Sequence, residues 1–383
     1  MIKRSLVNNG DYIRSAVELL VVFSFFNDNL IVDVFKSSFL LKGAIGLFII
    51  TFWKELFIAA RSNYGKRILL FVAILCLTII YNINDYTIGS IFGSLSLIVA
   101  IISITLVFYK ISSVKTLTFI WFSVLISIIY SIFKDPLSEY TFRRGGGTGD
   151  PNEFASHVIV FLLIGLGLYS LRKYKSVLVI TIPFFVIGIL NAGSVSSLIV
   201  SSIIIAIITG VTIKKNPKSI FLVFVSIITI GFSYNYILTI EDVQNVVDRA
   251  SSNEGNADAR FKAWNAAVGM FEHNPILGTG VGNFVKRASE YSHTRLEEGG
   301  ETAHNMFLLM IGEGGAIAGL LFIYLLYKSI NKNDVFSSGN PTYFYIFLSF
   351  LGLTLMGMTL SMTYDKYFWL LFAIQNKSVA SLK

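Results

Sequence analysis

The chain has 383 residues, of which 54% are hydrophobic and 14% are charged, and its mean hydropathy is +0.68. These values lie outside the range of soluble globular domains, so they exclude a soluble enzyme or binding module. The single cysteine, Cys76, excludes an intrachain disulfide framework and a cysteine metal site.

Long apolar runs recur between short charged connectors, and about 20 such residues in a helix span the hydrocarbon core of a bilayer. The runs predict an all-α integral membrane protein with about twelve transmembrane helices. The predicted spans lie near 14–34, 38–60, 67–83, 88–109, 114–133, 153–171, 176–192, 194–213, 219–239, 303–327, 343–362 and 366–376. The first apolar stretch has no small-residue cleavage site before or after it, so we expect the first span to be retained.

Lysine and arginine gather in alternate connectors, which predicts the orientation of the chain. With the N-terminus inside, the inner connectors carry these residues, whereas the short outer turns at 82–87 and 191–194 carry none. Both termini are therefore predicted to be cytoplasmic. This bias, next to an anionic inner leaflet, explains the net charge of +8 without any nucleic-acid partner.

Two longer polar segments interrupt the short outer turns, at 134–152 and 240–302. They divide the chain into nine spans with an outer loop (1–239), a long outer loop with an amphipathic helix (240–302), and three final spans (303–383). Both loops carry arginine on the side where the bias disfavours it. These arginines are Arg143, Arg144, Arg249, Arg260, Arg287 and Arg295. They are either ordinary solvated charges or contacts to an anion, since the guanidinium fork matches phosphate oxygens.

The long loop contains a predicted amphipathic helix over 258–271, because apolar residues recur there at intervals of three and four. Those residues are Phe261, Trp264, Ala267, Val268 and Phe271. Arg260 lies in the first turn, and Asn274-Pro275 ends the helix. The alternating glycines around Gly280 are not a dinucleotide fingerprint, because no strand precedes them. They form either an ordinary turn or a turn whose backbone N–H groups approach an anion.

Several short motifs occur in an order that resembles one family. In chain order they are Arg143-Arg144 before GDPNEFA at 149–155, Arg260 with Trp264, NPILGTGVGNF at 274–284, HNMFLLMIGEGG from His304, and KYFWLL at 366–371. Each motif is short, but together and on the same predicted side they resemble the O-antigen polymerase and O-antigen ligase superfamily.

The resemblance implies a membrane glycosyltransferase of the C-type (GT-C), multi-helix architecture, with a large periplasmic loop. Such an enzyme acts at the periplasmic face of the bacterial inner membrane. Its donor is an oligosaccharide carried on undecaprenyl diphosphate, its surroundings are membrane lipids, and a chain-length regulator protein is a further expected partner. The resemblance implies no nucleotide sugar, cofactor or metal, and the four histidines of the chain show no metal spacing on a helix face.

The transfer needs a cation for the leaving diphosphate and an acceptor for the proton of the attacking hydroxyl. By the resemblance, Arg260 contacts the diphosphate, Arg143 or Arg144 supplies a second cation, and His304 is the base. A lone histidine at a helix start is otherwise an interfacial or capping residue. Relatives carry an arginine near the eighth span, where this chain reads NAGSVSSLIVSS, so Lys42 is a further candidate for the second cation.

The remaining candidate substrate-binding residues are Asp150, Asn152, Asn305, Glu313, Gly280 and Asn283. Asp150 and Asn152 either cap the sixth helix or wall the glycan site. Asn305 orients His304 or binds sugar. Glu313 either pairs with a helix break or belongs to the site, because a carboxylate at membrane depth needs partners. His157 has a structural or substrate-lining role.

Polymerase and ligase share fold and donor and differ in the acceptor, which is a second lipid-linked glycan for the polymerase and a lipid A core for the ligase. The composition, rich in Ile, Phe, Ser and Lys, favours the polymerase. A flippase or secondary transporter is a third hypothesis, which predicts internal repeats with interrupted helices at matching places. No such correspondence is found in the sequence.

Overall fold

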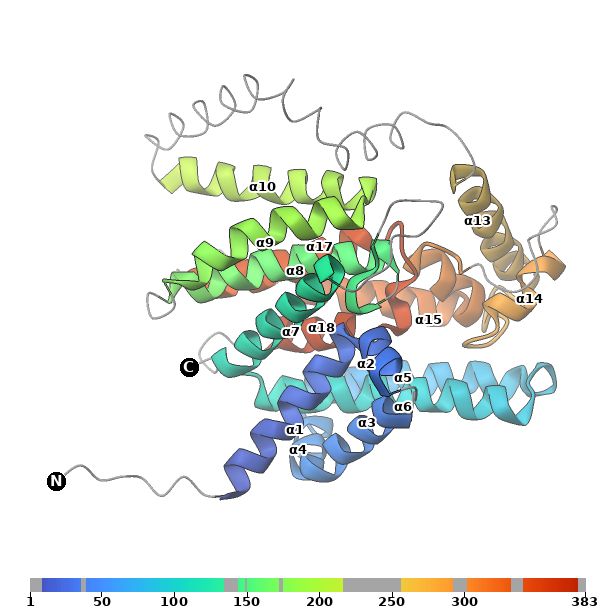
Figure 1. Cartoon of the computed structure of the whole chain (residues 1–383). Helices are drawn as coiled ribbons and strands as arrows, with labels where there is room; N and C mark the ends of the chain where they lie inside the picture. The colour runs from blue at the N-terminus through green and yellow to red at the C-terminus, as the bar shows by residue number, and fades with distance from the viewer. Residues whose placement is uncertain are drawn as a thin grey trace.

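The computed structural model describes residues 9–35, 39–133, 144–148, 150–171, 175–215, 256–291, 302–331 and 340–377. Within these ranges every regular element is helical (Figure 1). The α-helices are α1 (Asn9–Phe26), α2 (Asp28–Phe35), α3 (Phe39–Thr51), α4 (Trp53–Ala60), α5 (Asn63–Tyr81), α6 (Ile88–Ile111), α7 (Val114–Phe133), α8 (Pro151–Ser170), α9 (Val177–Ala192), α10 (Val195–Lys215), α13 (Asn256–His273), α14 (Phe284–Tyr291), α15 (Met306–Ile330), α17 (Pro341–Met356) and α18 (Lys366–Asn376). Three short 3-10 turns are η1 (Ile83–Asp85), η2 (Gly146–Thr148) and η3 (Met362–Tyr364).

Six of the described helices are long and apolar enough to cross a membrane, and the number is eight if each of two bent pairs is one span. The bent pairs are α1 with α2, at 98°, and α3 with α4, at 74°. Helices α9 and α17 are apolar but have only 16 residues each. The chain is thus an all-α, multi-pass membrane protein, as predicted. The predicted count of twelve spans goes beyond these helices, and the predicted span at 219–239 lies outside the described residues.

Helix starts follow the capping chemistry of the sequence. The side-chain oxygens of Ser62, Thr87, Asp150, Asn305 and Asn340 accept hydrogen bonds from backbone N–H groups at the starts of α5, α6, α8, α15 and α17. These bonds satisfy donors that would otherwise lack partners in the first turn.

The centre of the bundle is α8: in its most apolar stretch of 18 residues 78% are buried, against 22% in the corresponding stretch of α10. Helix α8 packs against α7, α9 and α17, and α10 lies outside this group against α17 and α8 (Figure 1). Burial of α8 on all sides explains why its sequence is apolar without a polar stripe. Polar residues in α8 therefore require a specific reason to be there.

The break between α1 and α2 is fixed at Asn27, a buried residue whose Nδ2 donates to the carbonyl of Ser123 in α7 at 2.9 Å. Gly147 in η2 lies so close that a Cβ there would be 2.5 Å from Oδ1 of Asn27. The close approach explains the glycine. The break brings the start of α2 next to η2 and the first turn of α8.

The polar turns that the charge bias assigns to one side are joined by contacts at one end of the bundle. Tyr86 Oη donates to the carbonyl of Val281 at 2.7 Å, and the amide of Arg144 donates to the carbonyl of Asn191 at 2.9 Å. The amide of Met306 donates to the carbonyl of Gly357 at 2.8 Å. Figure 1 shows α13 and α14 at this end, next to the ends of α5, α6 and α15.

Helix α15 is kinked at Gly315, where φ is 65° and ψ is −169°. Only glycine adopts this conformation without strain. The kink lets the turn at 278–280 lie against the helix: the amides of Thr279 and Gly280 donate to the carbonyls of Gly312 and Glu313 at 3.0 and 2.8 Å.

We expect Gly315→Ala to destabilise the protein by about 3 kcal/mol, because the strained backbone and a clash of Cβ with the Ile276 carbonyl add together. Thermal unfolding of the purified protein in detergent measures this. Gly210→Ala in α10 is the matched control, since a Cβ there has nothing within 4 Å. Equal melting temperatures for the two variants would contradict the role of the kink.

Candidate functional site

Helix α13 packs along α15 through small residues. Ala263, Ala266 and Ala267 are fully buried in this contact, and a Cβ at Gly312 would lie 3.0 Å from the Ala267 carbonyl. The sequence correctly predicts the helix but not its face. Phe261 is 58% exposed, because close packing of two helices selects alanine and glycine over large side chains.

The contacts between the two helices follow the same order along both segments, so the first half of α13 lies towards the start of α15. Ala267 is opposite Gly312, and further along the chain the amide of Ala316 donates to the carbonyl of Pro275 at 2.8 Å. Ala263 lies one turn after Arg260 on α13, and it belongs to the same buried cluster as Ala303, which precedes His304. The predicted pair Arg260 and His304 therefore lies at the same end of one helix interface, and both side chains are half-buried.

His304 has a backbone φ of 47°, and it is the only residue other than glycine with positive φ among the described residues. A histidine in the left-handed region is strained, and such strain persists only where neighbouring contacts enforce it. The strained residue directly precedes Asn305, the N-cap of α15. The imidazole is thus held at a sharp entry to the helix.

The contacts that enforce this turn come from Asn305 and the segment after α17. Oδ1 of Asn305 accepts from the amides of Phe307 and Leu308 at 2.9 and 3.1 Å, and its Nδ2 donates to the carbonyl of Met358 at 3.1 Å. Both ends of the amide are therefore used within the protein. The geometry favours the role in which Asn305 positions His304, and its contact with sugar stays a prediction.

The glycine-rich turn does approach an anion, and the anion is the protein's own Glu313. Its carboxylate is buried and accepts from the amide of Phe284 at 2.7 Å and from the hydroxyl of Tyr364. The amides of Gly282 and Asn283 also interact with it. Successive amides in such a turn form an anion-binding nest.

This arrangement gives the predicted substrate-binding residues Glu313, Gly280 and Asn283 a structural place. Glu313 lies two residues before the kink of α15 at Gly315, and its backbone carbonyl accepts a hydrogen bond from the Gly280 amide. Nδ2 of Asn283 donates to the carbonyl of Thr279 at 2.9 Å. Direct contact of these three residues with substrate stays a prediction.

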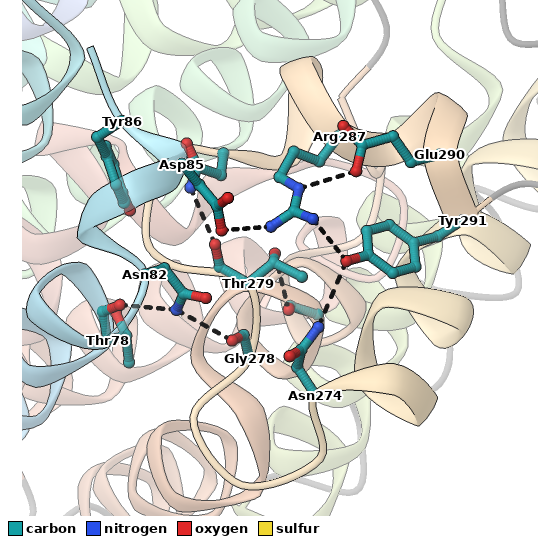
Figure 2. A network of polar contacts seen from close by, with 12 residues as sticks. Thr78, Asn82, Asp85, Tyr86, Asn274, Gly278, Thr279, Arg287, Glu290 and Tyr291 are labelled. Atoms are coloured by element: carbon teal, nitrogen blue, oxygen red, sulfur yellow. Dashed lines mark hydrogen bonds and ion pairs between the residues drawn. The ribbon is translucent and has the colours of Figure 1, made fainter.

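Arg287 belongs to a clasp between the turn after α5 and α14 (Figure 2). Its guanidinium pairs with Asp85 at 2.6 Å and Glu290 at 3.0 Å, and donates to the hydroxyl of Tyr291 at 2.8 Å. Two carboxylates neutralise this arginine. Although it lies in the long loop, its interactions hold α14 in place.

Arg144 is also engaged by the protein. Its Nη1 donates to the carbonyls of Ser131 and Ile132, the latter at 3.0 Å, where α7 ends. A cation there complements the negative end of the helix dipole. Its predicted contact with a diphosphate stays a prediction. Arg143, Arg249 and Arg295 lie outside the described residues.

The segment before α8 shows the predicted helix cap. Oδ1 of Asp150 accepts from the amides of Asn152 and Glu153 at 2.6 and 2.9 Å. Asp150 is exposed and Asn152 is half-buried, so both are accessible at the surface where α8 begins. Their role as a wall of the glycan site stays a prediction.

Sequence reasoning missed a group of carboxylates at this end of the bundle. Glu153 interacts electrostatically with Asp365, Asp28 and Asp150, and with the ammonium of Lys366. We call Asp28, Asp150, Glu153 and Asp365 the acidic cluster. They come from the starts of α2, α8 and α18, so only the fold brings them together. The available signal was charge at the edges of apolar runs, as in Asn27-Asp28-Asn29 and Asp365-Lys366.

His157 lies one turn after Glu153 in α8 and is fully buried. Its ring is edge-on to the rings of Phe26 and Tyr367, with centroids 4.7 and 4.2 Å away. Neither ring nitrogen has a hydrogen-bond partner in the described part of the chain. Both predicted roles of His157, structural and substrate-lining, are compatible with this position.

The described residues contain no group of three His, Cys, Asp or Glu side chains arranged to hold a metal ion. The carboxylates of the acidic cluster thus interact without converging on a common metal position. What the cluster offers is negative charge and hydrogen-bond acceptors.

Residues 177–323 match the family model described as O-Antigen ligase. The matched range begins with α9 and extends into α15, so it includes Arg260, His304 and Glu313 and excludes the acidic cluster. No curated protein and no solved structure matches the chain significantly.

Burial raises the pKa of Asp365 to about 7, with Asp28 and Asp150 acting in the same direction and Lys366 and the Tyr367 hydroxyl opposing it. Because the folded carboxyl binds its proton more tightly than the unfolded one, stability falls as pH rises from about 4 to 7 and stays reduced above. Asp365→Asn should therefore raise the melting temperature by a few degrees at pH 8 and by much less at pH 5. Exposed Glu272→Gln is the control; a gain that is equal at both pH values would refute the explanation.

Proposed function

We propose that this membrane protein is a polysaccharide polymerase. The match to the O-antigen ligase family model supports the proposal, and it confirms the resemblance to the O-antigen polymerase and ligase superfamily. It joins oligosaccharide repeat units carried on undecaprenyl diphosphate at the periplasmic face of the bacterial inner membrane. Both termini are cytoplasmic in this proposal, since the basic connectors then lie inside. The fold is then of the GT-C kind.

The observation that carries the proposal is the strained His304, which lies at the same end of the α13–α15 interface as Arg260. Strain of this kind is found at active sites, where the surrounding contacts maintain a geometry that the sequence alone disfavours. An imidazole and a guanidinium at the same end of one helix interface suit glycosyl transfer from a diphosphate. One group removes a proton and the other stabilises negative charge.

In the proposed reaction the hydroxyl of an acceptor sugar attacks the anomeric carbon of the donor glycan. His304 accepts the hydroxyl proton as the new glycosidic bond forms. The bond between the anomeric carbon and the phosphate oxygen breaks, and its electron pair leaves with the lipid diphosphate. Arg260 stabilises that charge through a bidentate contact. No metal is required by this scheme, because the guanidinium supplies the positive charge.

The second cation remains to be assigned among three candidates. Arg144 already binds the end of α7 through Nη1, and Arg143 lies outside the described residues. Lys42 is exposed in the first turn of α3. Of these, we favour Arg143, because the side chain of Arg144 already binds the carbonyls that end α7.

O-antigen ligase is the second candidate function, since the matching family model carries that description. The ligase would pass the glycan to a lipid A core instead of to another lipid-linked unit. Incubation of the purified protein with lipid-linked repeat units alone, and then with lipid A core added, separates the two. A ladder of lengths in the first reaction indicates polymerisation, and product only in the second indicates ligation.

His304→Asn tests the base, because asparagine tolerates the left-handed backbone and lacks the imidazole. We expect a loss of transfer of about 100-fold or more, with unchanged melting temperature. In cells, lipid-linked single units should still reach the periplasm. Units retained on the cytoplasmic leaflet would instead indicate a flippase and overturn the proposal.

Arg260→Lys keeps the charge but removes the bidentate fork, so we expect transfer to fall on the order of 100-fold. Arg287→Lys is the matched control from the same loop, since its partners Asp85 and Glu290 lie in a clasp that is separate from the reaction. We expect near wild-type transfer there. Polymer of wild-type length made by the Arg260→Lys variant would contradict the proposal that Arg260 binds the diphosphate.

A further inference from the structure

The acidic cluster has no role in the reaction as proposed so far. It gathers four carboxylates from the starts of three helices, and Lys366 is the cation found among their interactions. Such a concentration of like charge is unfavourable unless something uses it. Asp28, Glu153 and Asp365 are half-buried and Asp150 is exposed, so a ligand can reach the group from the surface.

His157 is the second observation that indicates a ligand here. Helical side chains lean towards the N-terminus of their helix, so the imidazole of His157 points towards Glu153, which lies four residues earlier on the same face. The ring is fully buried, and both nitrogens lack hydrogen-bond partners in the described part of the chain. An unsatisfied buried polar group requires an explanation, and a bound water or ligand is one such explanation.

Tyr367 connects the histidine to the cluster. Its hydroxyl donates to Oδ2 of Asp365 at 3.3 Å and accepts from Oγ of Ser156 at 3.4 Å, and its ring packs against His157. Aromatic and hydrogen-bonding groups thus lie beneath the carboxylates. The combination suits a polyhydroxylated ring, which presents hydroxyl donors at its edge and apolar C–H groups on its faces.

The cluster is close to the reacting end of α15. Thr363 Oγ1 donates to the carbonyl of Met306 at 3.0 Å, and Asp365 follows two residues later. The short segment with η3 therefore connects the start of α15 with Asp365 of the acidic cluster.

We propose that the acidic cluster, with His157 beneath it, is the subsite for the acceptor glycan and binds the hydroxyl groups of an uncharged sugar. The carboxyl oxygens accept hydrogen bonds from these hydroxyls, and the negative charge that the cluster retains disfavours the anionic diphosphate here. The proposal rests on the proposed function. It adds that the acceptor is selected by residues outside the range matched by the family model.

Binding is measured separately for the two substrates. The acceptor probe is the repeat-unit oligosaccharide released from its lipid, without phosphate, and the donor probe is undecaprenyl diphosphate without sugar. The variants are Glu153→Gln, Asp365→Asn and His157→Phe. The matched control is Asp33→Asn, which is on α2 with Asp28 but accepts from Tyr130 instead of joining the cluster.

We expect each cluster variant to weaken oligosaccharide binding by about 10-fold or more, with undecaprenyl diphosphate binding unchanged. Arg260→Lys should show the opposite pattern. Melting temperatures separate loss of binding from loss of fold, since the neutral variants remove charge repulsion and should unfold at equal or higher temperature.

Wild-type oligosaccharide affinity in all three variants would overturn the subsite while leaving the transferase proposal intact. A wild-type protein that binds the oligosaccharide but never transfers it would support the subsite and overturn the proposed function. Stabilisation of the wild type, but not of Glu153→Gln, by Mg²⁺ or Ca²⁺ would show that the cluster binds a cation and overturn the acceptor role.

Discussion

The buried carboxylate of Glu313 is the interaction on which the arrangement of the candidate site depends. A charge at this depth in an apolar helix requires donors, and the protein supplies them from the backbone of one turn and from Tyr364. The turn can reach the carboxylate only because α15 is kinked at Gly315. Holding the turn also holds the helices on either side of it, α13 and α14. The placement of Arg260 and His304 at the same end of the α13–α15 interface depends on that constraint.

The end of the bundle is organised by charge. Arg287 and Arg144 serve the protein itself, one through carboxylates and the other through the carbonyls that end a helix. The acidic cluster gathers at the starts of α2, α8 and α18, whereas Arg260 lies on α13. A donor with a diphosphate and an acceptor with only hydroxyl groups differ most in charge, so the proposed sites for the two substrates differ in the sign of their charged residues.

Breaks in the apolar helices occur where polar chemistry is located. The bend at Asn27 brings Asp28 to the start of α8, and the kink at Gly315 places the nest around Glu313. The strained His304 lies where a helix begins rather than within it. In each case a side chain or a glycine replaces the backbone interactions that a continuous helix would have made.

Much of the helical architecture follows from the sequence. Apolar runs, capping residues such as Asp150 and Asn305, and the Asn274-Pro275 stop predict helices whose positions agree with the described elements. The family resemblance also follows from short motifs and is confirmed by the match over 177–323. The buried face of α13 did not follow, because large apolar residues recur at helical spacing while alanines make the contact.

The sequence by itself determined the class of protein, its helices and the motifs that contain Arg260 and His304, because hydropathy, capping and motif order are local properties of the chain. Tertiary structure decided which arginines are used internally, that the glycine turn surrounds Glu313, and that Asp28, Glu153 and Asp365 meet. These features depend on residues far apart in the chain. Their interactions exist only when helix packing brings them within hydrogen-bonding or electrostatic range.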